Sequence, residues 1–541
     1  MHNKLRTNSI LFTQTRPYLD KIGNSSLLPV LFTLALFVVA GPLHLRKPLT
    51  TDSILWDLQT RWMNEGQGLY KETIEVNFPG AFYVHQISRS ILGQSNESLR
   101  IFDLVLIGIL VAALSRFIYL ASENRNLALW FPFLGFAFYF SIPEWGHCQR
   151  DLWALTFASL ACHFRLQAIT AHAVRKSFPV LAGGFIEGIL WGCSMLIKPH
   201  IFMVALSVYL VTFRINLVQR KLWLESIGLL FGGVLIFASC MAHLSWNHSL
   251  VPFFDTLAVW MPRYASGRSW SLENLLLLNA SLFPWAILHL IAIPYAIKIL
   301  IHNQPRDDDD ANRRIPLKVC SAAYLGWVLQ AFFIQKSFPY IFVPLVFLAI
   351  AIVLPLIKRL PLAWSRFSIV MLTLIAGLSQ VHYPTRLDLW PKAITDQLDA
   401  HDLDLLTSGD TSWAELEEVS DFLAERNVQH KDVLLCSADS IYLYWTLKLE
   451  SPTPYVYFDQ FRYLIAPSLS DSITEQAYSS GAKYAVNDLS FFAPNLDAAT
   501  LAFNPTEPFP IGLENAKLSA FPWKEKLVFR SGRYMVYEIS R

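Results

Sequence analysis

Apolar residues dominate the chain as far as residue 381, in long stretches that alternate with short polar segments. A helix needs about 20 mainly apolar residues to cross the hydrocarbon core of a bilayer. By this criterion the pattern predicts about 11 transmembrane helices, several of them short or interrupted by proline. They are expected near residues 27–46, 100–121, 127–143, 152–170, 178–197, 200–214, 222–246, 274–301, 317–335, 338–357 and 363–381. Residues 1–383 are therefore predicted to form a multi-span membrane domain.

From residue 384 onward the pattern becomes that of a soluble domain, because charged residues return and the apolar runs shorten. Residues 413–426 have the periodicity of an amphipathic helix, and a second helix is expected near residues 473–480. Short strands are predicted at 433–436, 484–486, 526–529 and 534–538, the last two joined as a hairpin. We expect residues 384–541 to form a small α/β domain with a structural or substrate-gripping role.

The polar segment at residues 47–99 separates the first two predicted spans and has structure of its own. A helix is expected in it because its apolar residues recur on one side, namely Ile54, Leu55, Leu58 and Trp62. Asp52 stands just before this helix, Gly66 and Gly68 can end it, and residues 77–80 read as a turn. An amphipathic helix beside a bilayer lies flat in the interface. This arrangement would hold Asp52 at the membrane surface.

Composition supports a membrane protein and excludes several other classes. Of the 541 residues, 53% are hydrophobic and 16% are charged, and the mean hydropathy is +0.36. Soluble domains carry about 25% charged residues. A net charge of +2 argues against a nucleic-acid-binding protein. Four of the six cysteines lie in apolar segments and none forms a CxxC pair, so neither a disulfide framework nor a zinc site is expected.

Basic residues in the loops predict the orientation, since Lys and Arg are enriched on the cytoplasmic side. They precede the first span, which we interpret as retained rather than as a cleaved signal. They recur on the same side as Arg175, Lys176, Arg214, Arg220, Lys221, Arg306, Arg313, Arg314, Lys318, Lys358 and Arg359. We therefore expect a multi-pass protein of the cytoplasmic membrane with its N-terminus inside. The loops at 47–99, 143–151 and 247–273, the 335–340 turn and the C-terminal domain would face outward.

Two aspartates of the first outer loop each have a structural and a functional interpretation. Asp52 is placed to cap the helix N-terminus, a role that Asp favours, or to act as a catalytic base. Asp57 can pair with Arg61 four residues later, or contact a substrate. Glu65, Glu72 and Glu75 are interpreted as residues of a solvated loop.

Further polar residues recur at the predicted outer ends of later spans. Charge at a membrane edge is a functional hypothesis when partners are near, whereas capping and snorkelling are the alternatives. Cations that converge on this side would suit a phosphate group. The candidates are Glu144, His147, Arg150, Asp151, Lys198, Gln335, Lys336 and Tyr340, with Tyr70 in the first loop.

Two other acidic features receive a structural interpretation. The run from Asp307 to Asp310 is flanked by arginines in a predicted cytoplasmic loop, and such runs are usually solvated and mobile. We predict no metal site there or elsewhere, and a divalent cation is neither required nor excluded by the sequence. Glu187 lies inside a predicted span, where a structural hydrogen bond is favoured over catalysis.

Taken in order, these motifs resemble the GT-C-type membrane glycosyltransferases, in the bacterial protein mannosyltransferase-like and aminoarabinose transferase-like group. The motifs are Asp52 at the start of a juxtamembrane helix, Arg150-Asp151 opening a span, Lys198-Pro199 after a Gly-rich span, and Gln335-Lys336-x-x-Pro339-Tyr340 before a late one. Each motif is loose, and the resemblance covers residues 27–381. Phe78-Pro79-Gly80 departs from the Lys-Pro-Pro frequent in the family.

The resemblance implies transfer of a sugar from a polyprenyl-phosphate carrier to a glycan, lipid or protein acceptor on the outer face of the membrane. It implies that Asp52 matches the family's catalytic aspartate, Asp151 its second acidic position and Lys336 a phosphate contact. The residues then suggest Asp52 as the general base and Arg150, Lys198 and Lys336 as partners of the departing phosphate. A transporter or flippase for a lipid-linked or anionic solute is the alternative, although the two similar halves frequent in transporters are not visible. A structural subunit with a degenerate site is a third reading.

Overall fold

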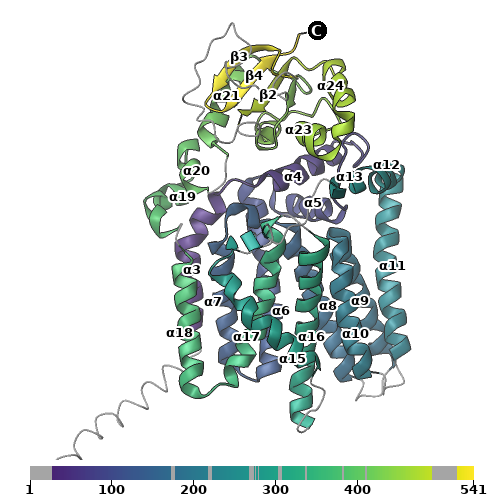
Figure 1. The fold of residues 1–541 in the computed structure, drawn as a ribbon, viewed down its shortest axis with the longest axis vertical. Coiled ribbons are helices and arrows are strands. Elements are labelled where there is room, and N and C mark those ends of the chain that lie inside the picture. The colour runs from purple at the N-terminus through teal and green to yellow at the C-terminus, as the bar shows by residue number, and fades with distance from the viewer. Residues whose placement is uncertain are drawn as a thin grey trace, which may run out of the picture.

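The computed structural model describes residues 27–171, 177–216, 222–266, 280–301, 308–335, 338–380, 383–407, 411–489 and 521–540, with single residues between 273 and 277. Long helices run side by side in a bundle, two shorter helices lie across one end of it, and a small sheet domain sits beyond them (Figure 1). Six helices in the described ranges are long and apolar enough to cross a membrane. The chain is a polytopic helical membrane protein, as the hydrophobic pattern predicted.

The helices of the bundle follow the predicted spans closely. They are α3 (Leu27–Arg46), α6 (Asn96–Ser122), α7 (Arg125–Ser141), α8 (Arg150–Ala171), α9 (Ser177–Ile197), α10 (Phe202–Asn216), α11 (Leu222–Trp246), α15 (His289–Ile301), α16 (Asp308–Leu329), α17 (Val343–Lys358) and α18 (Leu362–Leu378). In the span expected from residue 274, α15 begins at His289, and the described residues before it include helical positions at Leu276, Leu277 and Ala280. α16 continues as a π-helical turn, Gln330–Ile334, into the segment that precedes α17.

The aspartate run is helical where a mobile loop was expected. α16 begins at Asp308, so three of the four aspartates belong to its first turn, and Asp307 lies outside the described residues. Aspartate is favourable in a first turn because its charge opposes the helix dipole. This helix-starting preference explains the run without any ligand.

Glycines and one buried charge cluster join α8, α9 and α11. A Cβ on Gly188 or Gly232 would overlap the backbone of the facing helix, so the two backbones touch. Beside this contact Arg165 pairs with Glu187 at 3.0 Å and with Glu225 at 2.7 Å, all three side chains being buried. The structural role predicted for Glu187 is confirmed, since Glu187 also accepts a hydrogen bond from Trp191.

The C-terminal domain contains the predicted α/β elements. Its main elements are α19 (Trp390–Thr395), α20 (Ala400–Leu406), α21 (Trp413–Glu425), β1 (Val433–Leu435), the 3-10 turn Asp439–Ile441, α22 (Tyr442–Thr446), α23 (Phe458–Gln460), α24 (Ser470–Ser479), β2 (Tyr484–Asp488), β3 (Lys526–Ser531) and β4 (Tyr534–Glu538). The sheet order is β1-β2-β4-β3, with β1 and β2 parallel and the other pairs antiparallel. The predicted hairpin is the β3–β4 pair.

The first outer loop forms two helices, α4 (Thr51–Asn64) and α5 (Gly80–Leu92), of which only α4 was predicted. The N-cap of α4 is Thr50, whose side chain accepts from the Ser53 amide, so Asp52 lies inside the first turn and is not the cap. α4 is buried on its polar side as well, because α5 and the Glu75 segment pair with Asp57 and Gln59 and the C-terminal domain packs against the helix (Figure 1). Arg61 donates to the carbonyl of Leu449 at 2.7 Å across this contact. α4 lies across the end of the bundle (Figure 1), and its position flat in the membrane interface stays a prediction.

Candidate functional site

Two adjoining cavities lie where α4, the ends of the bundle helices and the C-terminal domain meet. The larger, of about 550 Å³, is here called the membrane-side chamber. The smaller, of about 280 Å³, reaches the C-terminal domain and is called the domain-side chamber. Both are lined by Val76, Asn77, Arg150, Tyr264, Phe338 and Tyr340. The shared lining means that a ligand can extend from one chamber into the other.

Asp52 faces the domain-side chamber from the first turn of α4. The opposite wall belongs to the C-terminal domain, with Asp439, Tyr457 and Gln460 among its lining residues. We expected a structural or substrate-gripping role for this domain, but none of its residues was among the candidates predicted from the sequence. Thr51 and Asp439 are in hydrogen-bond contact at 3.5 Å, which brings residues 388 positions apart to one wall.

Arg150 stands at the junction of the two chambers. Its guanidinium donates to the side-chain oxygen of Asn77 and lies over the Trp56 ring, 5.5 Å from the centroid. Its buried Nε has no hydrogen-bond partner among the described residues. A cation with a free donor at this junction is suited to an anionic ligand.

Glu75 holds Asn77 in position behind Arg150. The carboxylate accepts from the Asn77 amide at 2.7 Å and from its side chain at 2.5 Å, and from Gln59 at 3.0 Å. Glu75 is 2% exposed, so the solvated loop position expected from the sequence is wrong. Burial raises the pKa of Glu75 to about 7, against the lowering effect of these hydrogen bonds. The flanking Ile74 and Val76 are the one sequence signal that this segment is covered.

Lys198 and Asp151 form a buried ion pair beside the membrane-side chamber. Lys198 lines the chamber and lies 5.9 Å from the ring centroid of Tyr340, whereas Asp151 is fully buried and lines neither chamber. Burial lowers the pKa of Lys198 to about 8, although the negative charges of Asp151 and Asp52 oppose the shift. Asp151 therefore contacts Lys198 but does not itself line either chamber.

Gly80 is the point where the segment that carries Asn77 contacts the segment that carries Lys198. A Cβ at Gly80 would overlap the backbone of Leu196 and Ile197, at the end of α9. The turn that carries Asn77 therefore packs directly against the residues that precede Lys198. Gly80 belongs to Phe78-Pro79-Gly80, the segment that differs from the Lys-Pro-Pro frequent in the family that the sequence resembles.

Asp57 lies away from both chambers and does not pair with Arg61. Arg89 contacts both of its oxygens, at 2.6 and 2.7 Å, and His85 lies at 3.2 Å. Burial would raise the pKa of Asp57, but hydrogen bonds from His85 and Arg89 outweigh it and hold the pKa below its ordinary value. The pairing with Arg61, predicted from its position four residues later, is wrong because α5, which the sequence did not predict, supplies closer partners. Arg61 instead lies 3.7 Å from Glu65.

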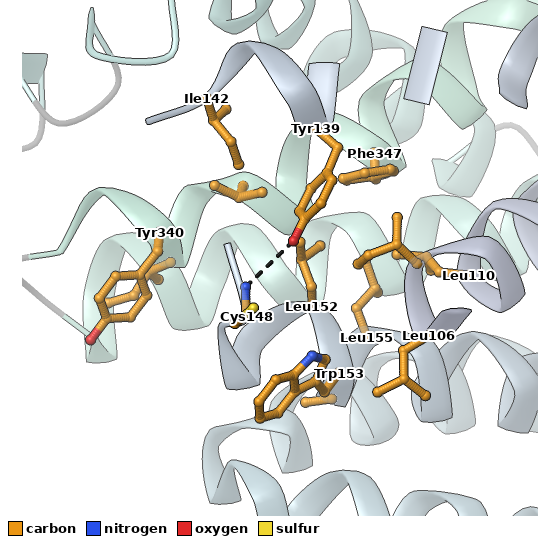
Figure 2. Close-up of a cluster of buried hydrophobic side chains, with 14 of the residues drawn as sticks. Leu106, Leu110, Tyr139, Ile142, Cys148, Leu152, Trp153, Leu155, Tyr340 and Phe347 are labelled. Carbon is orange, nitrogen blue, oxygen red and sulfur yellow. Dashed lines mark hydrogen bonds between the residues drawn. The ribbon is translucent and has the colours of Figure 1, made fainter. Parts of the chain in front are cut away.

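The remaining candidates are divided between the chambers and the packing around them. Gln335 and Tyr340 line the membrane-side chamber, while the Tyr70 hydroxyl donates to the Asn77 carbonyl at 2.6 Å. Figure 2 shows Tyr340 at the edge of a buried cluster, its hydroxyl pointing away from the Cys148–Tyr139 hydrogen bond. His147 is buried, with its ring 4.6 Å from that of His44. Lys336 lies outside the described residues.

Metal ligands are not clustered in the part of the chain that the structure describes. Within those ranges no group of three His, Cys, Asp or Glu side chains comes close enough together to hold an ion.

Comparison with known proteins identifies the fold. No family model matches the sequence, and no curated protein does. The solved structure of ArnT from Cupriavidus metallidurans bound to undecaprenyl phosphate matches with a TM-score of 0.53 and 16% identity, covering 94% of this chain and 97% of that one. The apo state of the same ArnT matches with a TM-score of 0.49 and 15% identity. The match to the lipid-bound structure shows that the chain has an ArnT-like fold, which confirms the fold predicted from the motifs.

Proposed function

We propose that the protein is a membrane glycosyltransferase that moves a sugar from a polyprenyl-phosphate carrier to an acceptor. The observation that carries the proposal is the pair of adjoining chambers, with Arg150 and Lys198 on one and Asp52 on the other. A cationic site beside a carboxylate is what transfer from a phosphate leaving group requires.

The membrane-side chamber is the proposed site of the donor phosphate. Apolar residues such as Phe338, Ile341 and Met261 line much of it, which suits the first isoprene units of a lipid carrier. Arg150 and Lys198 supply the positive charge. The lipid in the ArnT structure, undecaprenyl phosphate, supports this class of donor.

In the proposed reaction Asp52 takes the proton from an acceptor hydroxyl in the domain-side chamber. The acceptor oxygen forms a bond to the anomeric carbon while the bond from that carbon to the phosphate oxygen breaks. The electron pair of the broken bond leaves with the polyprenyl phosphate, where Arg150 and Lys198 stabilise the charge. Direct displacement inverts the anomeric centre.

Two further carboxylates are proposed to position these groups. Asp151 orients Lys198 through the buried ion pair, and Glu75 orients Arg150 through Asn77. Neither needs to touch the reacting atoms for this role.

The proposed location is the cytoplasmic membrane, with the chambers on its outer side and the N-terminus inside. α4, α5 and the C-terminal domain gather at one end of the bundle (Figure 1). The turn after α17, with Lys358 and Arg359, lies at the other end, which the positive-inside rule makes cytoplasmic.

Purified protein in lipid nanodiscs tests the proposal directly. Undecaprenyl phosphate carrying a radiolabelled sugar is added with an extract of envelope acceptors, and label in the acceptor is measured. Transfer that wild type catalyses and Asp52→Asn does not is the expected result. Movement of the labelled lipid across proteoliposomes without any transfer would instead indicate a flippase and overturn the proposal.

A further inference from the structure

A third cavity, of about 240 Å³, lies on the other side of the α4 N-terminus, between the α3–α4 junction and the C-terminal domain. Thr51 and Asp439 line both this cavity and the domain-side chamber, so the two spaces share one wall. Glu144, predicted from the sequence as a substrate contact, also lines it.

Aromatic rings and polar side chains alternate around this cavity. Its aromatic residues are Trp145, Trp413 and Tyr442, the last two in edge contact with ring centroids 4.9 Å apart. Thr407 and Thr411 add hydroxyl groups. The cavity is thus neither apolar nor open polar surface.

One buried donor in this wall lacks a partner. Trp413 is 8% exposed, and its Nε1–H makes no hydrogen bond to any residue the structure describes. A buried donor left unpaired costs about 1–3 kcal/mol, so such groups normally find an acceptor. A ligand oxygen in the cavity would supply it.

The chemistry of the lining selects the ligand class. Among the described residues that line the cavity, two are carboxylates, Glu144 and Asp439, and none is Lys, Arg or His, which disfavours phosphate and other anions even though Asp439 also pairs with Arg533 at 3.2 Å. A hydrocarbon chain would leave the Trp413 indole N–H unpaired, although Thr407 already donates to the Leu403 carbonyl at 3.1 Å. A sugar presents C–H faces to aromatic rings, and its hydroxyls both donate to carboxylates and accept from an N–H.

We infer that this cavity is a carbohydrate subsite for the acceptor. It is smaller than the roughly 300–1,000 Å³ of pockets that hold a whole ligand, so it would take one unit of a larger glycan. Thr51 and Asp439 form the wall between this cavity and the domain-side chamber, so the bound unit would lie next to the chamber that Asp52 lines. Its assignment to the acceptor rests on the proposed function, whereas its affinity for sugars does not.

Saturation-transfer NMR on the full chain in nanodiscs tests the inference without any donor. The probes are the methyl glycosides of glucose, galactose, mannose and N-acetylglucosamine and their disaccharides. Trp413→Phe keeps a ring but removes the N–H, and Thr411→Val keeps the shape but removes a hydroxyl. Trp364→Phe is the matched control, because Trp364 is 62% exposed on α18.

Wild type and Trp364→Phe are expected to bind at least one probe, and the two cavity variants to bind it about 2- to 10-fold more weakly, the effect of one hydrogen bond. Thr411→Val keeps the test valid if Trp413→Phe fails to fold. No binding by wild type, or equal binding by all the variants, overturns the inference. If both cavity variants weaken sugar binding but the wild type transfers no sugar, the subsite is supported and the proposed function is wrong.

Discussion

The hydroxyl of Tyr457 donates to the backbone carbonyl of Thr51 at 3.1 Å, across 406 positions of the sequence. Thr51 is the first residue of α4 and precedes Asp52, while Tyr457 lines the same chamber from the C-terminal domain. The Ile74 amide donates to the Pro454 carbonyl at 2.8 Å beside it. The C-terminal domain is therefore a wall of the candidate site.

Tyr457→Phe is expected to lower kcat/KM for the acceptor by about 2- to 10-fold, since one hydrogen bond contributes about 0.5–1.5 kcal/mol. Affinity for undecaprenyl phosphate should stay unchanged, because Tyr457 does not line the membrane-side chamber. Tyr478→Phe is the control, since it loses a hydrogen bond to Glu525 in the same domain but away from the chamber. Equal losses in both variants would contradict the prediction.

Asp52→Asn and Asp57→Asn are expected to fail in different ways. Asp52→Asn should insert and fold normally, because Thr50 provides the cap, and should lose transfer by at least about 100-fold for want of the base. Asp57→Asn leaves the buried Arg89 uncompensated, so it should cost about 3–5 kcal/mol of stability. Thermal unfolding and the transfer rate per folded molecule separate the two effects. A stable Asp52→Asn enzyme with near-normal rate would show that the base lies elsewhere.

Affinity for undecaprenyl phosphate is expected to fall as the pH rises through about 8. Lys198 has its pKa near 8, so it is cationic below that pH and neutral above it. The loss should approach about 10-fold per pH unit for a single proton. Lys198→Arg should bind with little pH dependence between about 7.5 and 9.5, because arginine stays protonated. Binding titrations of both proteins over this range check the prediction, and identical profiles would refute it.

Glu75→Gln is expected to weaken binding of the polyprenyl-phosphate donor by about 2- to 10-fold, because its NH2 group would replace one carboxylate oxygen and face the N–H groups of either Asn77 or Gln59. In wild type the carboxylate ionises as the pH rises through about 7, so transfer should rise over that interval, and the variant should lose that rise. The stability of the folded protein should change in the opposite direction. Because the pKa of Glu75 is raised in the folded state, that state binds its proton more tightly than the unfolded chain does, and the free energy of unfolding falls as the pH rises through about 7.

Kinetics of Glu75→Gln also distinguish its two conceivable roles. A positioning residue should change mainly the donor KM. A fall in kcat of at least about 100-fold with intact donor affinity would instead make Glu75, and not Asp52, the general base.

The elements of this fold were largely predictable because each is encoded locally. Apolar length predicted the spans, and alternation with turn residues predicted β1, β2 and the hairpin. α5 was missed because its Gly80 start lies in a segment that looked like a turn. Because α5 was not predicted, Arg61, the cation nearest to Asp57 in the sequence, was taken as its partner.

The site was predictable only in part, for a related reason. Arg150, Lys198 and Tyr340 stand beside span ends, so a topology places them on one side. Ile74, next to Glu75, donates to the Pro454 carbonyl of the C-terminal domain, and Asp439 faces Thr51 across 388 positions. Contacts of that separation leave no mark in a hydrophobic pattern.

Gly80 would mislead a genetic screen of this protein. Any side chain there would overlap the backbone at the end of α9, so either the turn that carries Asn77 or the residues before Lys198 must shift. Saturation mutagenesis would score this position as intolerant, on a par with a residue that takes part in the reaction. Gly80 thus sets the spacing between the turn that carries Asn77 and the end of α9, although it has no side chain to take part in the reaction.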